Sequence, residues 1–69
     1  MPPIYSKQAA KYLSVLDASS QKRIKFGILK IPLGDIKPLQ GAPGNFRLHV
    51  GDWRILFDYT DEKVVRIKK

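Results

Sequence analysis

The sequence predicts a small α+β domain in which an N-terminal antiparallel helical hairpin packs on one face of a small antiparallel β-meander. Apolar residues in the first half of the chain recur every three or four positions, which is typical of amphipathic helices. After residue 45, apolar and polar residues alternate, which is typical of half-buried strands. The 69 residues are too few for a second core, so we expect a single domain spanning residues 1–69.

A first helix is expected from Lys7 to Asp17, with Ser6 as its N-cap. Before it, Ile4 and Tyr5 allow at most a short edge strand, because the prolines at positions 2 and 3 cannot donate hydrogen bonds to a sheet. The apolar face of this helix consists of Ala9, Tyr12, Leu13 and Leu16.

A second helix is expected from about Gln21 to Lys30, and the residues "ASS" at 18–20 break the first helix and offer an N-cap for the second. Gly27 lies in the middle of this helix, where it costs up to about 1 kcal/mol relative to alanine. Close packing against the first helix would explain that glycine. Pro32 ends the helix. The apolar stripe consists of Ile24, Ile28 and Ile31.

The segment 32–45 contains three prolines and three glycines and is predicted to be a loop, anchored by Ile36 and Leu39. A structureless connection of this length is unusual in a compact domain, which indicates a functional or partner-facing surface. The glycines of "GAPG" at 41–44 are too few and wrongly spaced for a phosphate-binding loop, so we interpret them as turn residues.

A β-hairpin is predicted from Phe46–Val50 and Trp53–Tyr59, joined by the two-residue turn Gly51-Asp52. This turn length fixes the register, and residues directly opposite each other share a face of the sheet. One face is then wholly apolar and must pack on the helices, with Trp53 as a core residue and not a base-stacking platform. That inner face consists of Phe46, Leu48, Val50, Trp53, Ile55 and Phe57.

The opposite face of the hairpin collects Arg47, His49 and Arg54 beside Leu56. A third strand, Val64–Lys68, adds basic residues to this face if a three-residue turn at 60–62 pairs Leu56 with Arg66. A turn of two or four residues would send Arg66 and Lys68 to the core. Like charges placed opposite each other are destabilising, and a bound anion would offset the repulsion. The alternative interpretation is that this is an ordinary solvated sheet face. A solvated helix face is likewise the alternative for Lys22, Arg23 and Lys25 on the second helix.

The chain is strongly basic, with 13 Lys and Arg against 6 Asp and Glu, a net charge of +7 and a pI near 10.0. This charge favours RNA, DNA, an acidic protein or an anionic membrane as partner. The absence of cysteine excludes disulfides and thiolate metal sites, and a single histidine excludes a His-rich metal site. A core of this size supplies on the order of 3–5 kcal/mol, so a partner protein is the natural source of further stability. No apolar run approaches the length of a membrane span and no signal peptide precedes the domain, so we expect a cytoplasmic protein.

The stretch "DIKPLQGAPGNFRLHVGDWRILFDYTDEKVVRI", preceded by "SKQAAKYLSVLD", resembles the RelE/ParE superfamily of bacterial toxin–antitoxin toxins, on the RelE side. Its most specific part is Leu-x-Gly, a spacer, and then aromatic-Arg-Leu-x-Val-Gly-Asp-aromatic-Arg. The resemblance implies a helical hairpin packed on a small antiparallel sheet. It also implies a metal-independent endoribonuclease that cleaves mRNA in the ribosomal A site and inhibits translation. In that reaction the ribose 2′-hydroxyl attacks the adjacent phosphate and leaves a 2′,3′-cyclic phosphate.

Within this resemblance, Arg47 and His49 occupy positions where RelE-type toxins often have two basic residues, with lysine commoner at the second. Arg54 occupies the position of the arginine that contacts the scissile phosphate. A guanidinium binds phosphate oxygens bidentately, and an imidazole exchanges protons near neutral pH. We therefore expect these three residues to be catalytic, with His49 as general base. Residues expected to bind RNA or the ribosome are Lys22, Arg23, Lys25, Lys37, Arg66 and Lys68.

The resemblance further implies an acidic antitoxin and the ribosome with bound mRNA as partners, with no membrane and no cofactor or metal. The family normally continues into a final strand and a segment with a catalytic arginine and a tyrosine. Because the sequence ends at Lys69, we expect a RelE-like domain that is truncated at the C-terminus and lacks these groups. Two other functions stay open: a ParE-like toxin that inhibits gyrase, and an inactive RNA-binding remnant.

Overall fold

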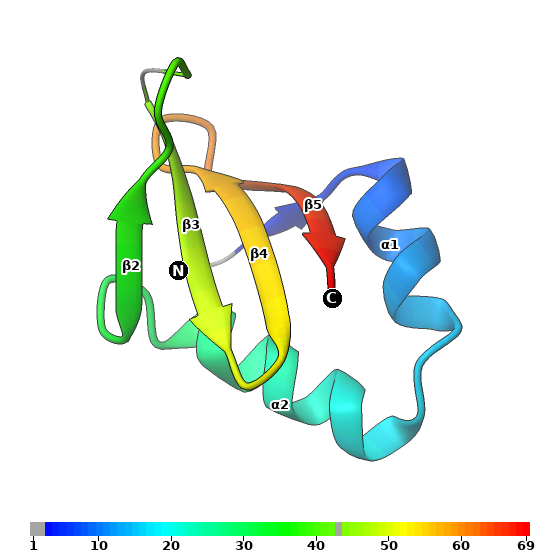
Figure 1. Cartoon of the computed structure of the whole chain (residues 1–69). Helices are drawn as coiled ribbons and strands as arrows, with labels where there is room; N and C mark the ends of the chain where they lie inside the picture. Colours follow the sequence, from blue (N-terminus) through cyan, green and yellow to red (C-terminus); the bar gives the residue numbers. More distant parts are fainter. Residues whose placement is uncertain (1–2, 43) are drawn as a thin grey trace.

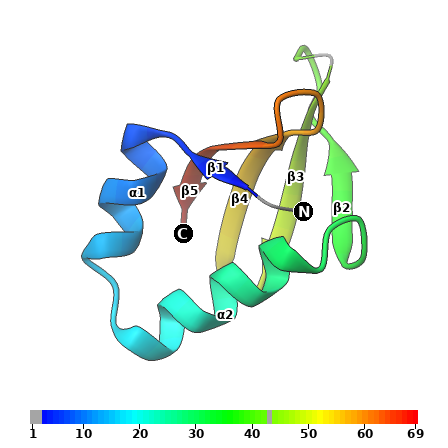
Figure 2. The ribbon, with the colours of Figure 1, turned by 180° about the vertical axis from the view of Figure 1, so that it is seen from behind.

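The structure is a computed structural model that describes residues 3–42 and 44–69. The predicted role of Pro2, and Pro43 within the predicted turn at 41–44, lie outside the described residues. The predicted α+β class is confirmed: both helices lie on one face of a five-stranded sheet (Figures 1 and 2). The elements in chain order are β1 (Ile4–Tyr5), α1 (Lys7–Ser14), α2 (Ala18–Leu29), β2 (Asp35–Pro38), β3 (Asn45–Val50), β4 (Trp53–Asp58) and β5 (Lys63–Lys68).

The sheet has the strand order β1-β5-β4-β3-β2 and contains two strands beyond the expected three-stranded meander. The short edge strand expected at Ile4 and Tyr5 is present, and it pairs in parallel with β5. The prediction that 32–45 is entirely loop is wrong, because β2 forms within it and pairs antiparallel with β3. Ile36 packs against the core from this strand. Pro38 is tolerated because β2 is an edge strand, where a missing N–H on the solvent side breaks no ladder.

Helix α1 begins as predicted at the Ser6 N-cap. The Ser6 hydroxyl accepts a hydrogen bond from the Ala9 N–H at 3.1 Å and donates one to the Val65 carbonyl oxygen at 2.5 Å. The helix ends at Ser14, not at Asp17 as expected. Its early end follows from the role of Asp17, which has extended backbone and caps the next helix.

Helix α2 begins at Ala18, three residues before the expected start. The predicted N-cap within 18–20 is wrong, because the Asp17 carboxylate accepts from the Ser20 N–H at 3.1 Å and from the Ser20 hydroxyl at 2.6 Å. Both bonds favour the charged carboxylate and hold the pKa of Asp17 below its ordinary value. The N-cap of α2 is therefore Asp17, one residue before the predicted segment 18–20.

Gly27 permits close approach of α2 to the sheet. A Cβ built on Gly27 would lie 2.7 Å from Cγ2 of Val50 and 3.7 Å from Cδ2 of Leu48, both on β3. The expectation that Gly27 allows packing on the first helix is therefore wrong. The two helices lie along different parts of the sheet, with α1 beside β5 and α2 against β3 (Figure 2).

The register predicted for the central hairpin is confirmed, with Val50 opposite Trp53 and His49 opposite Arg54. Gly51, the first residue of the turn, has a φ of 56°, a left-handed conformation that suits glycine in a two-residue hairpin loop. The six residues predicted for the inner face all contribute to the core or pack against it, Trp53 among them. The buried core consists of Ala9, Leu13, Ile24, Ile28, Ile31, Leu48, Ile55, Phe57, Val64 and Ile67.

Leu56 pairs with Arg66 of β5 as predicted, but the turn that precedes β5 differs from the expected one. The three-residue turn expected at 60–62 is wrong, because Asp58 pairs with Lys63 and leaves a turn of residues 59–62. A β-bulge between the Phe57–Val64 and Leu56–Arg66 pairs leaves Val65 as the extra residue. The bulge reverses the alternation along β5, so that Val64 and Ile67 are both buried while Arg66 and Lys68 are exposed.

Candidate nucleic-acid interface

The sheet face that points away from the helices, here called the outer face, carries two rows of side chains across four strands. Residues directly opposite each other on paired strands share a face, so each row follows from the register. The first row consists of Asp35, His49, Arg54 and Lys68. The second row consists of Lys37, Arg47, Leu56 and Arg66.

The cations of the outer face are open to solvent. Arg54, Arg66, Lys68 and Lys37 are exposed, and Arg47 is half-buried beside Leu56. Within residues 3–42 and 44–69, no ion pair joins an arginine or lysine of this face to a carboxylate. Apart from Asp35, which lies near His49, the charged residues of the two rows are cations or the potentially cationic His49.

The imidazole of His49 has a carboxylate beside it. His49 Nδ1 lies 3.8 Å from Oδ2 of Asp35, and the two side chains are 47% and 60% exposed. Sequence reasoning missed Asp35 because the loop interpretation of 32–45 concealed β2. The signal was present in "DIK", where Ile36 packs inward between two outward polar residues, a period-two pattern.

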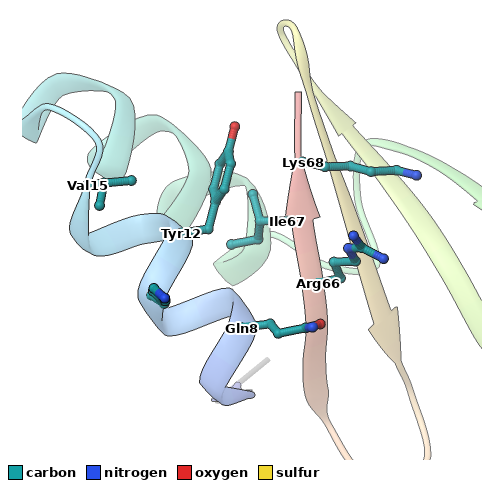
Figure 3. Close-up of a pocket in the computed structure, with 7 residues that line it drawn as sticks. Gln8, Tyr12, Val15, Arg66, Ile67 and Lys68 are labelled. Carbon is teal, nitrogen blue, oxygen red and sulfur yellow. The ribbon is translucent and has the colours of Figure 1, made fainter.

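The contribution of β5 to the outer face is visible in a close-up of the groove between α1 and β5 (Figure 3). Ile67 projects from β5 toward α1, on the side of Tyr12, whereas Arg66 and Lys68 project from the opposite side of the strand (Figure 3). Both cations therefore join the outer face, as the sequence predicts.

Solved structures of other proteins share this architecture. The chain is similar to the RelB–RelE antitoxin–toxin complex from Methanococcus jannaschii, with a TM-score of 0.74, 25% sequence identity, and coverage of 94% of this chain and 87% of that chain. The chain has a RelE-like fold. The archaeal RelE–RelB complex from Pyrococcus horikoshii OT3 has the same fold, with a TM-score of 0.70, 23% identity, and coverage of 96% of this chain and 90% of that chain. No family model and no curated protein sequence matches the chain.

The RelE-like fold separates the predicted site residues into two groups. Arg47, His49 and Arg54 come together on the outer face, with Lys37, Arg66 and Lys68 around them. Lys22, Arg23 and Lys25 lie instead on α2, on the helix side of the sheet. Arg23 turns toward the hairpin tip, where its Cζ atom lies 6.0 Å from the centroid of the Trp53 ring. Binding of RNA by the α2 cations stays a prediction.

The part of the chain that the structure describes contains no cluster of metal-ligand side chains and no helix suited to span a membrane. No cluster of three or more His, Cys, Asp or Glu side chains suited to a metal ion occurs among residues 3–42 and 44–69. Over the same residues, neither helix has the length and apolar character needed to span a bilayer. The titratable and charged groups of the outer face are guanidinium, ammonium, imidazole and carboxylate groups.

Proposed function

We propose that this chain is the toxin of a toxin–antitoxin pair and that its outer face binds and cleaves mRNA on the ribosome. The observation that supports this proposal is the outer face itself, where two adjacent rows hold unpaired cations around one imidazole. An RNA backbone offers a regular series of phosphates to such rows. The similarity to two RelB–RelE complexes supports the toxin role.

The proposed reaction is an internal transesterification. The ribose 2′-oxygen bonds to the adjacent phosphorus as the bond from phosphorus to the 5′-oxygen breaks, which leaves a 2′,3′-cyclic phosphate and a 5′-hydroxyl. His49 takes the proton of the 2′-hydroxyl, and the departing 5′-oxygen takes a proton from water, whose hydroxide is then neutralised by the proton that His49 releases. Arg54 lies directly opposite His49 and stabilises the negative charge that builds on the phosphate oxygens. Arg47, two residues before His49 on β3, binds the neighbouring backbone phosphate.

Asp35 acts in this proposal as a positioning residue. A hydrogen bond from His49 Nδ1–H to the Asp35 carboxylate requires the two atoms to approach by less than 1 Å from their present 3.8 Å. That bond would place the proton on Nδ1 and leave Nε2 as the free base. General bases are commonly held in one tautomer and orientation by such a third group. Lys37, Arg66 and Lys68 surround the reacting groups and hold the RNA strand.

The experiment that tests this function uses the purified full chain and ribosomes stalled on a defined mRNA. We expect cleavage inside the A-site codon, with 2′,3′-cyclic phosphate ends, and loss of cleavage in an Arg54→Ala variant. Lys7→Ala, an exposed lysine on α1 away from the outer face, is the matched control and should cleave normally. Gyrase-dependent DNA breakage would instead indicate a ParE-like toxin. Salt-dependent RNA binding without products would indicate an inactive remnant.

A further inference from the structure

The outer face changes character in the row that follows the second. In this third row, Asn45 pairs with Asp58, and the Leu39 N–H donates a hydrogen bond to the Asn45 carbonyl oxygen at 2.9 Å. The Asp58 carboxylate accepts a hydrogen bond from the Thr60 N–H at 2.7 Å. The cation of the row, Lys63, lies on β5, on the far side of Asp58 from β3. The part of the third row nearest β2 is therefore apolar, amide and acidic, and it does not attract a phosphate.

An open pocket adjoins this part of the sheet, where β2 ends and β3 begins (Figure 1). The pocket, here called the β2-end pocket, has a volume of about 540 Å³ and is lined by Lys37, Pro38, Leu39, Gln40 and Arg47. It shares Lys37 and Arg47 with the second row, where the two residues lie directly opposite each other. Leu39 is half-buried but, in the described chain, is not one of the residues that pack on the core. The pocket therefore combines two cations, an apolar surface and one amide.

These side chains match the parts of a single nucleotide. Lys37 and Arg47 suit a backbone phosphate, which Arg can bind bidentately. Pro38 and Leu39 offer an apolar surface to the face of a base. The Gln40 amide offers both a donor and an acceptor to the edge of that base. Single-stranded RNA presents bases in this way, because its bases can be splayed out of the stack and read along their edges.

We infer that the β2-end pocket holds the base of the nucleotide next to the cleaved bond and that Gln40 selects adenine there. Outward residues two apart on a strand, such as His49 and Arg47, are separated by about 7 Å, which is close to the span of one nucleotide of extended RNA. A phosphate held between His49 and Arg54 therefore places the next phosphate at Arg47 and its base at the pocket. An amide pairs bidentately with adenine through N6 and N7.

The third row favours a base over other occupants of the pocket. A base carries no charge, so it can lie beside the row that contains Asp58. The carboxylates of an acidic peptide would be repelled there. The inference rests on the proposed function, because that function supplies the RNA strand. The two are distinguishable, since selection of a base is measured by binding alone, without ribosomes and without cleavage.

The test uses the full chain and the trinucleotides UAU, UGU, UCU and UUU, with fluorine in place of each 2′-hydroxyl so that no transesterification occurs. We expect NMR titration to show that UAU binds about five-fold or more tightly than the others, with shift changes centred on Leu39 and the Gln40 side-chain amide. Gln40→Leu keeps the size of the side chain but removes the amide, so the preference should disappear while binding persists. Gln8→Leu is the matched control and should keep the preference, because Gln8 lies in the groove between α1 and β5.

Several results would overturn the inference: no binding of any trinucleotide at low salt, equal affinity for all of them, an unchanged preference in Gln40→Leu, or shift changes centred away from the β2-end pocket. A glutamate-rich peptide that binds at Leu39 and Gln40 in place of RNA would assign the pocket to an acidic protein segment. Adenine selection in a chain that does not cleave mRNA would support this inference and contradict the proposed reaction. Cleavage without any selection in the trinucleotide titration would contradict this inference alone.

Discussion

His49 and Asp35 face each other across the β2–β3 ladder, with Nδ1 of the imidazole 3.8 Å from Oδ2 of the carboxylate. On the other side of His49 lies Arg54, directly opposite it on β4. The imidazole is therefore flanked by one anion and one cation in a single row. Nδ1 is the ring nitrogen that lies near the carboxylate.

The first prediction concerns the Asp35–His49 pair. Asp35→Asn should slow mRNA cleavage, because the amide is a weaker acceptor for Nδ1–H, and Asp35→Glu should restore part of the rate. His49→Gln should lower the cleavage rate further, by about 10²- to 10⁴-fold, because it removes the base itself. The ¹⁵N chemical shifts of His49 provide a readout that a merely structural role would not move. A full cleavage rate in His49→Gln, or an unchanged tautomer and rate in Asp35→Asn, would contradict these roles.

The second prediction separates activity from stability at Arg54. Arg54→Ala should lower the cleavage rate by about 10²- to 10³-fold, as removal of a single charge-stabilising donor does in other active sites. Its free energy of unfolding should change little, because the side chain is exposed on the outer face. Stalled-ribosome cleavage and urea denaturation measure the two effects. If Arg54→Ala unfolds the protein, the assignment of this side chain to the outer face is wrong.

The third prediction concerns the inner face. Leu48 is 2% exposed and packs in the core between the sheet and α2. Leu48→Ala should lower the free energy of unfolding by about 2–5 kcal/mol, enough to unfold a domain of this size. Val15→Ala, at an exposed position, should change it by less than about 0.5 kcal/mol. Circular dichroism during urea titration compares the two variants, and equal effects would refute the assignment of Leu48 to the core.

The fourth prediction concerns the contact of Gly27 with β3. Gly27→Ala gains helix propensity of about 1 kcal/mol, but its methyl group would lie 2.7 Å from Cγ2 of Val50. Valine is stiff about χ1, so the helix or the strand must shift, and overpacking of this kind costs about 1–3 kcal/mol. We expect net destabilisation of the single variant.

A double-mutant cycle gives the control for Gly27. In a Val50→Ala background the obstructing methyl is gone, so Gly27→Ala should become neutral or stabilising. Urea denaturation of the four proteins gives the coupling free energy. Equal effects of Gly27→Ala in both backgrounds would mean that this contact does not explain the glycine.

The fifth prediction concerns pH and the Asp17 cap. Hydrogen bonds from the Ser20 hydroxyl and N–H hold the pKa of Asp17 below its ordinary value in the folded state. The folded protein therefore binds fewer protons than the unfolded chain, so this stabilisation is present above about pH 4 and is lost as pH falls through the lowered pKa. Asp17→Asn keeps a capping oxygen but does not titrate. Its unfolding free energy should fall less between pH 6 and pH 3 than that of the parent chain, and equal falls would contradict the prediction.

The sequence alone determined the hairpin and its two faces. Strict alternation and a two-residue turn are local features, and together they place Leu48 inside and His49 outside without knowledge of the rest of the chain. The same local logic predicted the Ser6 cap and the class of the fold. The catalytic candidates came from this alternation together with the family resemblance.

Only the tertiary structure decided the features that depend on contacts distant in sequence. The bulge at Val65 keeps Arg66 and Lys68 on the outer face, and it lies where the Ser6 hydroxyl bonds the Val65 carbonyl from the other end of the chain. Strand β2 forms because β3 offers it an edge, which brings Asp35 beside His49. The physical reason is that the face on which a hairpin residue lies is fixed by its neighbours along the chain. Bulges, edge strands and the close approach at Gly27 are fixed by partners that the chain meets only when folded.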